Sequence, residues 1–135
     1  MRYLFGLLVA GVAFTALTFL SDRTTAAESE SIESVMKKLY SKKGIFKTMK
    51  ASVGEGGSDW AVYGKQSKDY VKLADALCKC KPELGTQASW DKLTKEHLDA
   101  AKALDQASTK KDLEAVKKAL ATLQDTCEAC HENHR

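Results

Sequence analysis

The chain has 135 residues, enough for one domain of ordinary size, and 44% of them are hydrophobic and 29% are charged. This composition excludes disordered and collagen-like proteins. The formal net charge is only +3, and lysines are interleaved with acidic residues along much of the chain. A nucleic-acid-binding domain usually has a strongly basic face and a pI above about 9. We therefore expect no nucleic-acid partner.

The first 27 residues have the pattern of an export signal. Arg2 precedes an uncharged apolar run from Tyr3 to Leu20, and the following polar stretch ends in the small residues Thr25-Ala26-Ala27. This pattern predicts a signal peptide over residues 1–27 that is cleaved after Ala27, with export to the periplasm or otherwise across the cytoplasmic membrane. The apolar run is also just long enough to span a bilayer. The alternative is an uncleaved N-terminal anchor, and a membrane is expected to take part only in that case.

The first predicted helix follows directly. Apolar residues at spacings of three and four predict α-helices throughout residues 28–135, and no stretch alternates like a half-buried strand. This helix begins behind Ser29 or Ser31 as N-cap and ends at the glycine-rich loop 54–57. Gly44 lies inside it, where glycine weakens a helix by about 1 kcal/mol relative to alanine. Its apolar side consists of Ile32, Val35, Met36, Leu39, Phe46, Met49 and Val53.

The second predicted helix opens at Ser58. Asp59 lies in its first turn, where a negative charge suits the helix dipole, and Pro82 and Gly85 end the helix. Its apolar residues are Tyr63, Tyr70, Leu73, Ala74 and Leu77.

The third predicted helix begins at Ser89, and Thr109 with Asp112 three residues later predicts the cap of the fourth. The apolar side of the third helix consists of Trp90, Leu93, His97, Ala101 and Leu104. That of the fourth consists of Leu113, Val116, Leu120, Leu123, Cys127, Cys130 and His134. Four helices with short connections bury such sides most simply as an up-down-up-down bundle. We therefore predict an all-α fold, an antiparallel four-helix bundle that forms one domain over residues 28–135.

The fourth helix carries the motif Cys127-Glu128-Ala129-Cys130-His131, which is the C-x-x-C-H pattern of covalent haem attachment. At about 100° per residue, Cys127, Cys130 and His131 lie within an arc of roughly 100° on a helix. Two thioethers and one imidazole can therefore meet a single porphyrin. We predict one covalent haem c, attached through the two cysteines, with His131 as the proximal iron ligand.

Three other interpretations of the motif are a zinc site, a redox dithiol and a structural disulfide. Zinc would need His134 as well, but Cys127 and His134 are about 10 Å apart along a helix, too far to converge on one tetrahedral ion. A thioredoxin-like dithiol would be expected near a βαβ unit, which the pattern lacks. The haem interpretation is preferred.

With an export signal, four helices and C-x-x-C-H on the last one, the chain resembles the cytochrome c′ family, including its low-spin four-helix-bundle relatives. The resemblance covers residues 28–135 and is most specific at Cys127-x-x-Cys130-His131-x-x-x-Arg135, because the family typically ends with a basic residue one turn after the haem histidine. It implies that Arg135 supports the His131 ring. His134 stands where the family often has an aromatic residue. Family members are often dimers, so a homodimer is a candidate assembly.

A methionine is the predicted sixth ligand of the iron. In an up-down bundle the start of the first helix and the end of the fourth lie at the same end. Met36 is about 10 Å from that start and His131 about 6 Å from that end, so both can approach the haem at similar depth. The resemblance agrees, since low-spin members draw a methionine from this helix. The alternative is that Met36 fills the core, while Met49 lies near the other end and is excluded.

These features predict an electron carrier whose haem iron cycles between ferrous and ferric states, with redox proteins as partners. We expect no enzyme, because the chain has no constellation of nucleophile and base. The main rival, which the resemblance also implies, is a five-coordinate haem protein that binds or senses NO or CO. A third class is a helical metal-storage or interaction module without haem.

Cys78 and Cys80 have no counterpart in the resemblance. In an oxidising compartment they could form a strained bridge with each other or an intermolecular disulfide. The alternatives are inert thiols and a second metal or redox site.

Four further features have ordinary explanations beside a functional one. His97 lies on the apolar side of its helix, where a packed core histidine is the preferred interpretation over an iron ligand. Trp90 and Tyr70 are expected to pack in the core or around the haem. The lysines between Lys37 and Lys50 form a solvated face that could also steer an acidic partner.

Overall fold

The computed structural model describes residues 30–135, which contain five α-helices and no strand. The predicted signal peptide and its cleavage site lie outside these residues. None of the described helices is long and apolar enough to cross a lipid bilayer. The helices are α1 (Ile32–Tyr40), α2 (Ile45–Gly54), α3 (Trp60–Cys78), α4 (Gln87–Lys110) and α5 (Leu113–His134).

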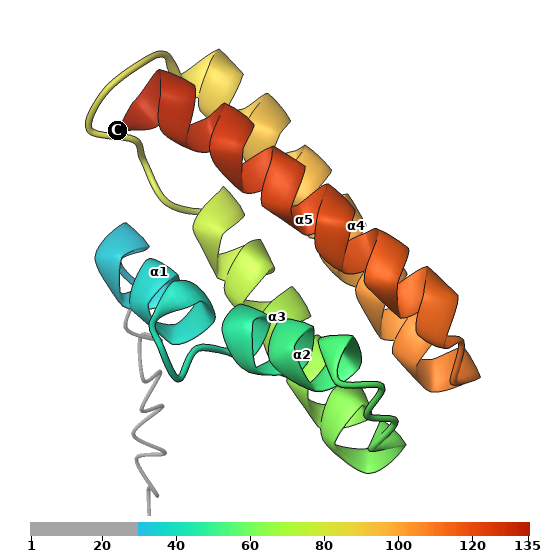
Figure 1. The fold of residues 1–135 in the computed structure, drawn as a ribbon. Coiled ribbons are helices and arrows are strands. Elements are labelled where there is room, and N and C mark those ends of the chain that lie inside the picture. Colours follow the sequence, from blue (N-terminus) through green and yellow to red (C-terminus); the bar gives the residue numbers. More distant parts are fainter. Residues whose placement is uncertain (1–29) are drawn as a thin grey trace, which may run out of the picture.

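The helices form a four-helix bundle in which α1 and α2 together take the first position (Figure 1). The most extensive contacts join α4 to α3 on one side and to α5 on the other. Contacts of α2 with α3 and α5, and of α1 with α3, close the bundle. The predicted all-α bundle is confirmed.

The prediction of one continuous first helix was wrong, because the chain breaks between α1 and α2. Gly44 is the N-cap of α2 rather than an interior residue of a helix. A Cβ atom at this position would lie 2.5 Å from the carbonyl oxygen of Leu39, so only glycine lets the chain return so close to the end of α1. Both short helices turn their apolar sides to the same core, which is why their pattern resembles that of one long helix.

Several predicted helix boundaries are corrected by the caps. Asp59, not Ser58, caps α3, since the carboxylate accepts the N–H three residues on. Thr86 caps α4, which therefore begins before Ser89, and Thr109 lies inside α4. Side-chain oxygens cap four of the five described helices in this way: Ser31, Asp59, Thr86 and Asp112.

The core runs the length of the bundle and includes Tyr70 and Trp90, as predicted, with exposures of 0% and 3%. Every helix contributes to it, and the fully buried large side chains are Val35, Leu39, Met49, Tyr63, Tyr70, Leu104, Val116 and Leu123. The C-terminal end of α5 lies beside the loop that joins α3 to α4 (Figure 1). This end of the bundle carries the candidate site.

Candidate haem site

A small cleft lies among the helices towards the C-terminal end of α5. All three residues of the attachment motif line it, and so does the predicted sixth ligand. Its lining consists of Met36, Tyr40, Leu77, Thr94, His97, Thr126, Cys127, Cys130 and His131. The structure therefore brings together residues that the sequence placed on the first and last helices of the bundle.

The two motif cysteines are free thiols on the inner side of α5. Cys127 is half-buried, Cys130 is buried, and His131 lies exposed at the rim. Burial raises the pKa of Cys127 to about 11 and also raises the pKa of Cys130 above its ordinary value. A thioredoxin-like dithiol needs a lowered thiol pKa, so this environment argues against that alternative. Within residues 30–135, no three His, Cys, Asp or Glu side chains gather as metal ligands would.

Met36 is half-buried on α1 and lines the cleft opposite the motif-bearing helix. Met49 is completely buried in α2 and is not among the cleft residues, as its exclusion requires. The two methionines thus differ in access to the site. The role of Met36 as a ligand stays a prediction.

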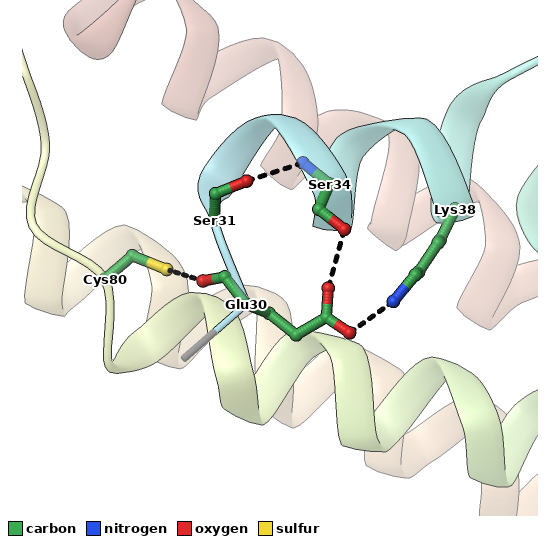
Figure 2. Close-up of polar contacts among 5 residues, drawn as sticks. All are labelled: Glu30, Ser31, Ser34, Lys38 and Cys80. Atoms are coloured by element: carbon green, nitrogen blue, oxygen red, sulfur yellow. Dashed lines mark hydrogen bonds and ion pairs between the residues drawn. The ribbon is translucent and has the colours of Figure 1, made fainter. Parts of the chain in front are cut away.

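The position of α1, and with it that of Met36, is set by polar contacts at the start of the helix (Figure 2). Ser31 accepts the backbone N–H of Ser34 as N-cap. The carboxylate of Glu30 accepts hydrogen bonds from the Ser34 hydroxyl at 2.7 Å and from the Lys38 ammonium. The carbonyl of Glu30 accepts from the Cys80 thiol at 3.2 Å. The last contact ties the start of α1 to the chain just after α3.

Cys78 and Cys80 form no bridge in the structure, where both are free thiols. Cys78, the last residue of α3, donates to the carbonyl of Thr94 at 3.4 Å, while Cys80 donates to the carbonyls of Glu30 and Ala76. Each sulfur thus has its own backbone partner. This arrangement matches the inert-thiol interpretation.

The cleft also contains a buried hydrogen-bond network that the sequence did not predict. The hydroxyls of Tyr40 and Tyr70 bond each other, and each lies 3.3 Å from Nε2 of His97. Nδ1 of His97 is 2.8 Å from the Thr126 hydroxyl, and the Tyr40 hydroxyl is 2.8 Å from Sγ of Cys127. Burial lowers the pKa of His97 to about 4, so its ring is neutral at neutral pH. The preferred interpretation of His97 as a packed, hydrogen-bonded histidine matches these contacts.

The last two site-related residues lie at the end of α5. Nδ1 of His134 is 2.7 Å from the carbonyl oxygen of Leu84, and its ring packs edge-on against Trp90 with centroids 5.2 Å apart. His134 thus packs as an aromatic side chain at this position would. Arg135 is exposed directly after the helix, and its support of His131 stays a prediction.

A family model described as Cytochrome C′ matches residues 23–135, which is most of the chain. The chain belongs to the cytochrome c′ family. Membership implies a c-type haem protein, and cytochromes c′ are typically periplasmic proteins without enzymatic activity. Neither the search of curated proteins nor that of solved structures found a match.

The residues of this cytochrome c′ fit a covalent haem. The cleft offers two free thiols at C-x-x-C spacing and an imidazole from the next residue, which is the set of groups that haem c attachment uses. The thiols lie towards the interior of the bundle and the imidazole lies at its rim.

Proposed function

We propose that this cytochrome c′ is an exported electron carrier with one haem c. Cys127 and Cys130 would hold the haem as thioethers, His131 would be the proximal iron ligand, and Met36 the sixth ligand. The bound haem supplies the one-electron chemistry of the ferric and ferrous states. The observation that supports the proposal is that Met36 and His131, from the first and last helices, line one cleft.

A methionine ligand favours electron transfer because it leaves no coordination position open to a gas. The protein keeps this ligand in place through the contacts at the start of α1, which attach Glu30 to Cys80. Leu77 and the ring of Tyr40 give the cleft an apolar lining, and an apolar lining that limits the access of water helps set the redox potential.

The partner we propose is an acidic redox protein, which would dock on the basic face formed by α1, α2 and the turn between them. Residues 34–54 carry six lysines and no acidic residue, whereas the rest of residues 30–135 carries 13 basic against 16 acidic residues. Charge is therefore segregated here, unlike in the rest of the chain. The six lysines are all exposed, and Lys38 is the only one of the six that forms an ion pair within residues 30–135. A concentrated charge accelerates association with a surface of opposite sign.

The ligand assignment is tested by the spectra of the haem-loaded wild type, Met36→Leu and Met49→Leu. Leucine conserves volume, so each change should cost less than about 1.5 kcal/mol. The wild type and the Met49→Leu control should be low-spin, with a weak sulfur-to-iron charge-transfer band in the ferric state. Met36→Leu should lose this band and become high-spin. A wild type that is already high-spin and binds CO readily would instead support the gas-binding alternative.

The basic face is tested with a small anionic reductant, Fe(II)-EDTA, as a stand-in for an acidic surface. A double variant Lys42→Glu and Lys43→Glu is compared with Lys102→Glu and Lys118→Glu, which changes the net charge equally on α4 and α5. At low ionic strength the first variant should be reduced more slowly than the second, and salt should remove the difference. Equal rates for the two variants would contradict the docking proposal.

A further inference from the structure

In the hydrogen-bond network beside Cys127, donors and acceptors can be assigned one after another, beginning at Thr126. The Thr126 hydroxyl donates to the carbonyl of Leu123 at 2.9 Å, so its oxygen is left to accept from Nδ1–H of His97. A neutral imidazole carries one N–H, and Nε2 of His97 is therefore an acceptor. The lowered pKa of His97 agrees with a neutral ring.

Two tyrosine hydroxyls compete for that one acceptor. Tyr70 is completely buried, and its hydroxyl contacts the Tyr40 hydroxyl and Nε2 of His97. The hydroxyl of Tyr40 contacts the Tyr70 hydroxyl, the same Nε2 atom and also the sulfur of Cys127. If Tyr70 donates to the Tyr40 oxygen, with which it makes its closest contact, the two hydroxyls stay hydrogen-bonded and the hydrogen of Tyr40 is free for the sulfur. The thiol of Cys127, for its part, can give its single hydrogen to Tyr40 or to the carbonyl of Leu123, which lies at 2.9 Å.

Haem attachment removes this freedom at Cys127. The S–H bond adds across a vinyl double bond of the haem, so that sulfur gains a bond to one vinyl carbon and the hydrogen ends on the other. The step needs no oxidant or reductant. The resulting thioether sulfur has no hydrogen and can only accept. Of the two groups near the sulfur, the carbonyl of Leu123 cannot donate, whereas the hydroxyl of Tyr40 can.

We propose that Tyr40 is a positioning residue for the haem, donating a hydrogen bond to the thioether sulfur of Cys127. Behind it Tyr70 donates to the Tyr40 oxygen, while Nδ1–H of His97 donates to Thr126 and Thr126 donates to the Leu123 carbonyl, so that every donor in this relay has an acceptor. The proposal rests on covalent haem attachment but not on the identity of the sixth ligand. The hydrogen bond restrains the thioether and draws electron density from a sulfur attached to the porphyrin, which favours the ferrous state.

The test compares haem-loaded Tyr40→Phe with Tyr63→Phe. Tyr63 is buried, and its hydroxyl donates to the carbonyl of Gly57 at 2.8 Å, but it is not among the residues that line the cleft. Both variants therefore remove one hydrogen-bonded tyrosine hydroxyl. Tyr40→Phe should lower the midpoint potential and shift the proton resonances of the Cys127 thioether and the adjacent haem methyl. Tyr63→Phe should leave potential and resonances at their wild-type values. Equal potentials for the two variants would overturn the proposal.

A second measurement needs only the wild type. The Tyr40 hydroxyl proton should exchange slowly with solvent and show a nuclear Overhauser effect to the β-protons of Cys127 in the ferrous protein. If the haem is covalently bound and this contact is absent, the relay proposal is wrong while the proposed haem attachment stands. If acid-acetone extracts the haem from the wild type, thioether attachment itself is refuted, and both proposals fail.

Discussion

Acidification should destabilise this protein through His97. The side chain is 4% exposed, and burial lowers its pKa to about 4 from 6.5 for the free group. Since the folded state has the lower pKa, the unfolded chain binds the proton more tightly. The associated stability is therefore present above the unfolded pKa of 6.5 and is lost as the pH falls towards about 4.

The magnitude follows from the two pKa values. The full effect, reached below pH 4, is about 3 kcal/mol, and about 2 kcal/mol of it should be lost between pH 7 and pH 5. Such a loss is a large part of the stability of a small domain, which is typically about 5–15 kcal/mol.

The assay is urea unfolding of the haem-loaded wild type and of His97→Asn at pH 7 and pH 5. Asparagine keeps a side-chain N–H for Thr126 but does not titrate in this range. Lysine partners lower the pKa values of carboxylates such as Glu30 and Asp69. Protonation of these carboxylates in acid also lowers the free energy of unfolding, but by the same amount in both proteins. The wild type should lose about 2 kcal/mol more than the variant. An equal loss in the two proteins would refute the reasoning.

Substitutions at three further positions probe the backbone and the caps through the free energy of unfolding, which urea titration measures. Gly44→Ala places Cβ 2.5 Å from the Leu39 carbonyl oxygen and should cost about 1–3 kcal/mol; an unchanged stability would mean that the turn relaxes freely. Gly85→Ala forces φ of +82° on alanine, with a similar cost, and a neutral result would contradict that backbone conformation. Asp112→Ala removes the acceptor for the N–H of Ala115 and should cost about 1 kcal/mol, whereas Asp112→Asn should largely preserve the cap.

Much of the helical architecture could be predicted from the sequence, because its signals are local. Spacings of three and four place apolar side chains on one side of a helix whatever the helix packs against. The Ser31 cap and the grouping of Cys127, Cys130 and His131 on one side of α5 likewise depend only on neighbouring residues. Haem attachment could be predicted for the same reason, since one helix supplies all the residues that it needs.

The break at Gly44 was decided by tertiary structure. Residues on both sides of it face the same core, so periodicity alone does not distinguish two short helices from one long helix. What distinguishes them is the close approach of Gly44 to the backbone of Leu39, a contact that no local spacing records.

The relay beside the haem site depended even more on packing. Tyr40, Tyr70, His97 and Thr126 come from α1, α3, α4 and α5, and each has an ordinary explanation in its own helix. The four-residue spacing of Met36 and Tyr40 does place both on one side of α1, which was the only local signal. The hydroxyls and the imidazole become one network only when four helices bury them together, because away from water each polar group must find its partner among the others.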